Sequence, residues 1–158
     1  MIVSNATALV LFARIGRLPL LHDVLRELVI PQAVADELAV SGKPGAAEVQ
    51  AADWIRVVAV QDRDRIEQLP AHLGRGEREA IVLAKELGAT LLSDDGPARR
   101  VAEEQGLQVT GSLAVLLQAK EHGLIPTVKG LLDEMIRRGF RISQQPHREV
   151  LERAGELA

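Results

Sequence analysis

The apolar residues of this chain follow two spacings that alternate along its length. Short apolar runs predict buried strands, and they stand at residues 2–3, 28–30, 55–58, 90–92 and 107–109. Between these runs apolar residues recur every three or four positions, most clearly at residues 77–87 and 98–105, which predicts helices. Strands that alternate with helices are typical of βα units, so we expect an α/β fold with a mainly parallel sheet.

Proline and glycine residues indicate where these elements begin and end. Pro31 directly follows an apolar run and can occupy the first turn of a helix that reaches about residue 40. Residues 41–45 then form a loop. Gly88 and Gly106 each close a helix before the next strand, a position where glycine is favoured.

The last third of the chain changes character. The hydroxyl groups at Thr110 and Ser112 offer a cap to a further helix, and after Gly123 the pattern is helical only. No linker, repeat or low-complexity segment interrupts the chain. We therefore expect one domain over residues 1–158, with a core of about residues 1–125 and a helical C-terminal extension of about 126–158.

Composition narrows the possible functions. The formal net charge is -3, which argues against general coating of nucleic acid through phosphate neutralisation alone. Aromatic residues make up only 2%, so an extended base-stacking platform is not expected. The chain contains no cysteine, which excludes disulfides, thiol catalysis and cysteine-bound metals. Because it has neither a signal-peptide pattern nor a long apolar run, we expect a soluble, cytoplasmic protein without membrane contact.

Polar residues follow the first and fourth predicted strands, where ligands bind in open α/β sheets. Asn5 and Thr7 follow the first strand, and Asp94 and Asp95 follow the fourth. The alternative for the aspartates is a helix cap, with Asp95 at the N-cap and Pro97 at the first helical position. One carboxylate suffices for a cap, so the pair slightly favours a functional role.

Two glutamates continue the apolar faces of predicted helices. Glu77 shares its face with Ala80, Ile81 and Ala84, and Glu37 shares its face with apolar neighbours in the helix after the second strand. The alternatives are a favourable position at a helix N-terminus for Glu77, and an edge position or a salt bridge for either. A carboxylate that points inward is costly unless it is paired or metal-bound.

Taken together, these side chains form a candidate metal site. Asn5, Glu37, Glu77, Asp94 and Asp95 can converge at one end of the sheet, and an oxygen-only set suits Mg²⁺ or Mn²⁺. Such ions favour phosphodiester hydrolysis. The candidates for holding a nucleic-acid backbone are Arg75, Arg78, Arg99 and Arg100, whose alternative is an ordinary solvated surface.

These stretches resemble the PIN domain superfamily, and most closely its DUF3368 subfamily. The residues that carry the resemblance are IVSNATALVLFARIGRLPLL, VIPQAVADEL, LGRGEREAIVLAKELGATLLSDDGPARRVAEEQGL and VTGSLAVLLQAKEHGLI, which run in family order to about residue 125. The later GFRISQQPHREVLERAGE also looks like the ending of that subfamily. The resemblance implies a three-layer α/β/α sandwich with a mainly parallel sheet, to which the pattern after Gly123 adds a helical C-terminal tail.

The resemblance also implies a function and a set of site residues. Family members act as metal-dependent ribonucleases, commonly as the toxin of a toxin–antitoxin pair. The acidic positions correspond to Asn5, Glu37, Glu77 and Asp95, with Asp94 as a neighbour and Thr7 as a nearby hydroxyl. The expected cofactor is Mg²⁺ or Mn²⁺, and the expected partners are single-stranded RNA, a small antitoxin and a second copy of the chain.

Asn5 departs from the family pattern, which has an aspartate at this position. A neutral amide removes one negative charge from the site and weakens its attraction for a cation. Two hypotheses therefore stand side by side. The protein is a PIN-type endoribonuclease that acts through Glu37, Glu77 and Asp95, or it is a PIN-like module that binds RNA or a small partner without cleavage.

Overall fold

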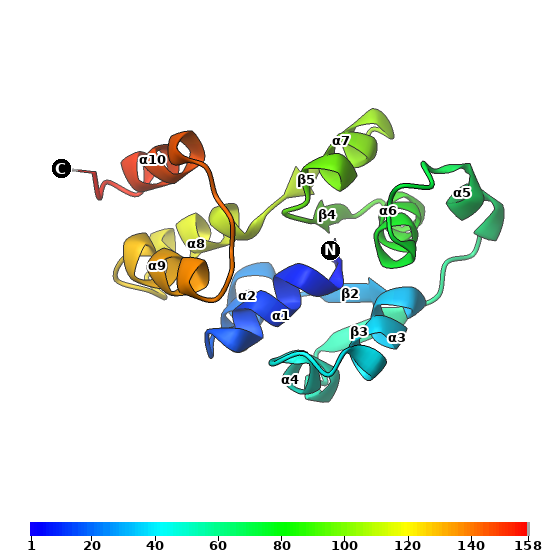
Figure 1. Ribbon diagram of the computed structural model, residues 1–158, viewed down its shortest axis with the longest axis horizontal. Coiled ribbons are helices and arrows are strands. Elements are labelled where there is room, and N and C mark those ends of the chain that lie inside the picture. The colour runs from blue at the N-terminus through cyan, green and yellow to red at the C-terminus, as the bar shows by residue number, and fades with distance from the viewer. Residues whose placement is uncertain (158) are drawn as a thin grey trace.

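The computed structural model describes residues 1–157, in which a five-stranded parallel sheet has the order β3-β2-β1-β4-β5 (Figure 1). The strands are β1 (Ile2–Ser4), β2 (Leu28–Pro31), β3 (Ile55–Val58), β4 (Thr90–Leu92) and β5 (Val109–Thr110). The central strand β1 pairs in parallel with β2 on one side and with β4 on the other.

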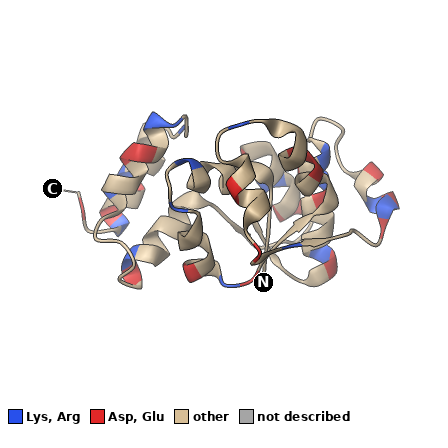
Figure 2. Ribbon diagram, turned by 90° about the horizontal axis from the view of Figure 1, so that it is seen from below, with Lys and Arg blue, Asp and Glu red and all other residues tan. Residues whose placement is uncertain are grey.

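Helices connect these strands and continue beyond the last of them. They are α1 (Ala6–Arg14), α2 (Leu18–Leu25), α3 (Gln32–Ser41), α4 (Ala46–Ala51), α5 (Arg63–Gln68), α6 (Arg75–Leu87), α7 (Gly96–Glu104), α8 (Ser112–Glu121), α9 (Val128–Arg137) and α10 (Gln144–Arg153). Figure 2 shows acidic and basic residues interspersed along them. None of the helices within residues 1–157 is long and apolar enough to cross a membrane.

The sheet is buried on both faces because successive residues of its strands point to opposite sides. Val29 packs in the cluster that includes α5, α6 and α7, whereas Leu28 and Ile30 pack in the cluster that includes α1, α2, α8 and α9. β4 divides in the same way, with Leu91 on the first side and Leu92 on the second. This arrangement confirms the predicted three-layer α/β/α sandwich.

Most predicted elements are present, with local corrections. The fifth strand lies at Val109–Thr110, slightly later than the prediction of 107–109. Pro31 ends β2 and forms the N-cap of α3, so the helix begins one residue later than expected. α4 and α5 were not predicted, because each spans only six residues and offers little periodicity.

The predicted hydroxyl cap of α8 is wrong. Gly111 holds the N-cap position and gives no side-chain bond. Instead Asp94, from the end of β4, accepts hydrogen bonds from the Ser112 backbone N–H at 2.8 Å and from the Ser112 hydroxyl at 2.5 Å. The residue that caps α8 is therefore 18 positions away in the sequence and could not be found from local pattern.

The C-terminal extension returns to the sheet through a short segment, residues 138–143, which we call the strap. It follows α9 in a Schellman motif, in which Gly139 has φ +106° and the Phe140 N–H donates to the Met135 carbonyl at 2.9 Å. Farther on, Glu156 accepts from the backbone N–H of Val128 at 2.7 Å and so caps α9. The extension is thus held by specific bonds at both ends of α9.

Candidate functional site

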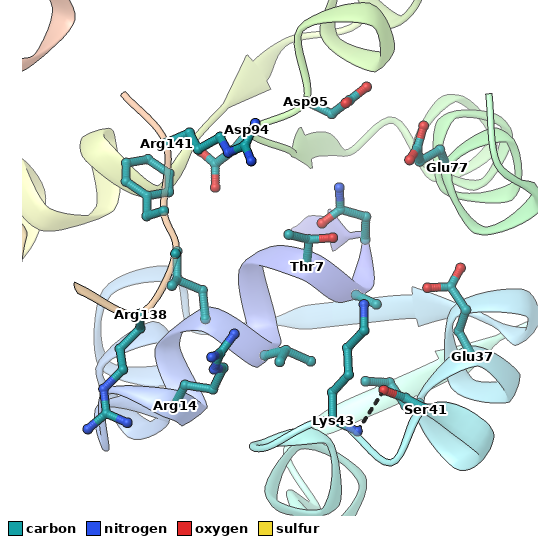
Figure 3. Close-up of a pocket in the computed structure, with 17 residues that line it drawn as sticks. Thr7, Arg14, Glu37, Ser41, Lys43, Glu77, Asp94, Asp95, Arg138 and Arg141 are labelled. Carbon is teal, nitrogen blue, oxygen red and sulfur yellow. Dashed lines mark hydrogen bonds between the residues drawn. The ribbon is translucent and has the colours of Figure 1, made fainter. Parts of the chain in front are cut away.

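A cleft of about 440 Å³ lies at the carboxyl ends of β1 and β4 (Figure 3). Six of the residues singled out in the sequence line it together. They are Asn5, Thr7, Glu37, Glu77, Asp94 and Asp95. Parallel strands bring these side chains together because their carboxyl ends meet at one edge of the sheet.

Glu37 and Glu77 face the cleft from two helices that pack against each other. Glu37 lies in α3 and is solvent-exposed, so its carboxylate does not point into the core. Gly76 is buried beneath it in the first turn of α6, and a Cβ there would lie 2.5 Å from the Glu37 Oε1 atom. The absence of a side chain at Gly76 therefore gives the Glu37 carboxylate its place beside α6.

The pKa of Glu77 is raised above its ordinary value of 4.5. Burial is the largest cause, and the negative charge of Asp95 is the second, with Glu37 adding to it. A hydrogen bond from the Gly74 backbone acts in the opposite direction. The neighbouring carboxylates of Asp95 and Glu37 thus disfavour the ionised form of Glu77, as expected where several carboxylates gather in one cleft.

The two adjacent aspartates have different contacts. Asp94 uses both carboxylate oxygens on Ser112, as described above. Asp95 is exposed and caps α7, accepting from the Ala98 N–H at 2.9 Å through Oδ2. The cap predicted for Asp95 is therefore present, and within residues 1–157 its Oδ1 atom makes no hydrogen bond. Asp95 can combine a capping role with a role in the cleft.

Asn5 is buried at the end of β1 and holds two elements in place. Its Oδ1 atom accepts from the Ala8 N–H at 3.4 Å, a long bond that caps α1. Its amide group donates to the Ser93 hydroxyl at 3.2 Å, across to the end of β4. The Ser93 hydroxyl in turn accepts from the Asp95 N–H at 3.2 Å. An aspartate at position 5 could not donate to Ser93, so the amide has a structural use of its own.

Sequence reasoning missed the cations of this cleft. They are Arg14, Lys43, Arg138 and Arg141, and all four are exposed. Figure 3 places the three arginines on the side away from Glu77, and Lys43 between Arg14 and Glu37. Arg14 lies seven residues after Thr7 on the same face of α1, so helical phase could have found it. Arg138 and Arg141 reach the cleft only through the strap, for which the sequence holds no local signal.

The four arginines selected from the sequence do not line this cleft. Arg75 donates to the Glu79 carboxylate at 3.3 Å, and Arg99 donates to the Ser93 carbonyl at 2.7 Å from a neighbouring cavity. Arg100 is exposed, and the Nε atom of Arg78 is buried without a partner among the described residues. A role for them on a longer substrate stays a prediction.

Glu79 is a second feature that sequence reasoning missed. Its carboxylate is almost wholly buried, with 1% of the residue exposed. It accepts from the Ala33 N–H in the first turn of α3 at 3.0 Å, and it pairs with Arg63 at 3.4 Å and with Arg75 at 3.3 Å. Because Pro31 gives α3 no side-chain cap, Glu79 supplies that cap from α6. It thereby fixes the helix that carries Glu37 against the helix that carries Glu77.

The donor set fits a hard divalent cation in its chemistry. Glu37, Glu77 and Asp95 offer carboxylate oxygens only, which suits Mg²⁺ or Mn²⁺ rather than zinc. Within the described part of the chain, however, no group of three or more acidic or histidine side chains is arranged to hold a metal ion as it stands.

The structure is thus a parallel α/β/α sandwich with carboxylates at the carboxyl ends of its central strands, the edge where ligands bind in open α/β sheets. The chain belongs to the DUF3368 family of PIN domains, whose model matches residues 1–156. PIN domains are nuclease and nucleic-acid-binding modules that generally use divalent metal ions. The resemblance stated from the sequence is therefore confirmed.

A solved structure supports the fold independently. The chain is similar to a PilT N-terminus domain protein, SSO1118, from the hyperthermophilic archaeon Sulfolobus solfataricus P2. The match has a TM-score of 0.56 and covers 90% of this chain and 100% of that one. At 17% sequence identity this similarity concerns the fold alone. No curated protein matches the chain.

Proposed function

We propose that this protein is a divalent-metal-dependent endoribonuclease of the PIN type. The observation that carries the proposal is the division of one cleft into two sides. Glu37, Glu77 and Asp95 gather on one side, from segments far apart in the sequence, and three arginines lie on the other, with Lys43 between Arg14 and Glu37. A phosphodiester chain needs both sides, because its backbone is anionic and its hydrolysis needs a concentrated negative site for a cation.

In this proposal the three carboxylates hold Mg²⁺ or Mn²⁺, which when bound polarises the phosphate and lowers the pKa of water. Glu77 already carries an environment that disfavours its ionised form, so a nearby positive charge relieves an existing repulsion from Asp95. Asp95 keeps its backbone position through the cap on α7. Two of the three carboxylates, those of Glu77 and Asp95, thus stand at the N-terminal ends of helices that are formed before any ion binds.

The cationic side orients the substrate. Arg14, Lys43 and Arg141 are exposed along the cleft and can contact successive phosphates. Arg138 also lines the cleft, but it pairs with Glu134 at 3.0 Å, which offsets part of its charge. Because the net charge of the chain is -3, attraction of RNA is confined to this local group rather than spread over the surface.

The test is cleavage of a diverse single-stranded RNA pool in excess Mn²⁺ or Mg²⁺. Glu77→Gln and Asp95→Asn are expected to abolish cleavage, and asparagine preserves the cap that Asp95 gives to α7. Glu103→Gln, an exposed position on α7 outside the cleft, is the matched control and should cleave normally. Cleavage that survives both cleft substitutions, or an intact RNA pool beside an active relative, would refute the proposal.

The second candidate is a module that binds RNA or a small partner without cutting it. Asn5 favours it, because the amide lowers the charge of the site and is engaged with Ala8 and Ser93. Asn5→Asp separates the two candidates. A gain of cleavage would indicate a weakened nuclease, whereas robust and equal cleavage in both forms would exclude a role limited to binding.

The proposed setting is that of a cytoplasmic toxin with a small antitoxin partner, acting as a homodimer. This part of the proposal comes from the family and not from the cleft. A short open reading frame next to the gene would favour the pair, and co-expression of its product should then suppress cleavage. Light scattering on the purified protein measures whether it forms the expected dimer.

A further inference from the structure

A second cavity, of about 720 Å³, lies on the other side of the strap. It shares three lining residues with the cleft, namely Asp94, Phe140 and Arg141. Two of these belong to the strap, so the strap forms a common wall between the two spaces. A chain that occupies the cleft and passes Phe140 therefore enters the second cavity next.

The walls of the second cavity combine apolar and cationic groups. Leu113 and Leu117 of α8 and Ile142 of the strap give an apolar surface, and Arg99 and Arg153 stand beside it. Asp94 and Glu149 also line the cavity, but both Asp94 oxygens are already bonded to Ser112. An apolar surface beside cations is suited to a nucleotide, whose base is flat and apolar and whose phosphate is anionic.

Among the aromatic residues within residues 1–157, Phe140 alone is placed to contact a base there. The chain has two Phe, one Trp and no Tyr. Phe12 is fully buried in the core, and Trp54 stacks on His22 with ring centroids 4.8 Å apart. Neither of them lines either cavity. Phe140 lines both and is half-buried.

The backbone at Phe140 is fixed in advance. Phe140 occupies the position two residues beyond the C-cap of α9, where the Schellman bond to the Met135 carbonyl holds its N–H at 2.9 Å. Gly139 has φ +106°, a conformation that other residues rarely adopt. A side chain on such a turn loses little conformational entropy when a ligand contacts it.

We propose that Phe140 and Arg141 form a nucleotide subsite, in which one unpaired base next to the cleft stacks on Phe140 and enters the second cavity. This inference rests on the proposed function, because it assigns a subsite for the same single-stranded RNA. It predicts that recognition of the strand continues beyond the carboxylates toward α8 and α10. A peptide partner is the rival occupant of the second cavity.

The test measures fluorescence anisotropy of a labelled single-stranded RNA octamer bound to the Glu77→Gln protein in Mg²⁺. Phe140→Ala is expected to weaken binding about tenfold, the effect of losing one base–aromatic stack. The same measurement is repeated with octamers that carry a single abasic sugar at each position in turn. At one position the abasic sugar should weaken binding by itself and remove the effect of Phe140→Ala.

Phe140→Leu is the matched control, because leucine preserves the apolar contact of the Schellman motif but offers no ring. It should bind the octamer as weakly as Phe140→Ala, while its thermal unfolding stays close to that of the parent. The subsite is refuted if the Phe140→Leu protein binds the octamer as tightly as the protein with phenylalanine. It is also refuted if Phe140→Ala weakens binding equally for the intact octamer and for every abasic octamer. If the parent protein binds no RNA at all, the proposed function fails first, which is a distinguishable result.

Discussion

Gly76→Ala should separate stability from function in this protein. Gly76 lies in the first turn of α6, within a helix and without a positive φ, so alanine is compatible with its backbone. Alanine is favoured over glycine in a helix by about 0.5–1 kcal/mol. Judged by helix propensity alone, the substitution would stabilise the protein.

The effect of the substitution falls instead on the position of Glu37 in the cleft. The new Cβ would lie 2.5 Å from the Glu37 Oε1 atom and 3.3 Å from Val34 Cγ2, whereas ordinary contact begins at 3.4 Å. The Glu37 carboxylate ends a flexible side chain and must move by about 1 Å, a displacement that can cost about 100-fold in rate. Val34 needs to yield only slightly. We therefore expect a folded protein whose Glu37 no longer faces Glu77 correctly.

The assay compares thermal unfolding, Mn²⁺ binding by calorimetry and RNA cleavage for the two proteins. Gly130→Ala is the matched control, since Gly130 also lies in the first turn of a helix and its new Cβ meets only Thr127 Oγ1, at 3.3 Å. For Gly76→Ala we expect an unchanged or raised Tm together with weakened Mn²⁺ binding. For Gly130→Ala we expect Mn²⁺ binding to stay unchanged. Unchanged Mn²⁺ binding and cleavage in a stable Gly76→Ala protein would show that the position of Glu37 is irrelevant.

Two further predictions concern carboxylates of α6. Glu79→Ala leaves the buried Ala33 N–H without its acceptor, at a cost of about 1–3 kcal/mol in the free energy of unfolding. Glu79→Gln keeps an acceptor for this N–H and should lower the free energy of unfolding by less than Glu79→Ala. Equal decreases for the two variants in urea titrations would contradict this account. Glu77→Gln should unfold at a higher temperature than the parent at neutral pH, because the raised pKa of Glu77 makes its ionisation unfavourable to the folded state. That penalty is absent below pH 4.5 and grows as pH rises through the raised pKa, so melts across pH should show the advantage of glutamine vanishing in acid.

Much of the fold could be predicted because parallel strands that are buried on both faces appear as apolar runs. The same reasoning located Glu77 and Asp95, since each lies where a strand or helix end is marked by its neighbours. Glu79 was within reach as well: the buried Val82 and Leu83 follow it by three and four positions, so its helical phase pointed inward.

What the sequence could not supply are relations between distant segments. Asp94 caps α8 across 18 positions, and nothing near Ser112 indicates this. Arg138 and Arg141 are distant in sequence from every carboxylate of the cleft, and only the course of the strap brings them there. Local pattern specifies elements, whereas partners that meet through tertiary packing follow from the fold as a whole.

The topology also fixes the order in which this protein can mature during synthesis. Of the five strands of this sheet β1 leaves the ribosome first, and it is the central strand, which pairs with β4 across 88 residues, from Ile2 to Thr90. The chain emerges N-terminus first, so β1 must wait for its second neighbour. The carboxylates gather only when β4 docks, and the strap brings its arginines later still. A domain proposed to cut RNA thus completes its cleft only after residues 138–141 have emerged.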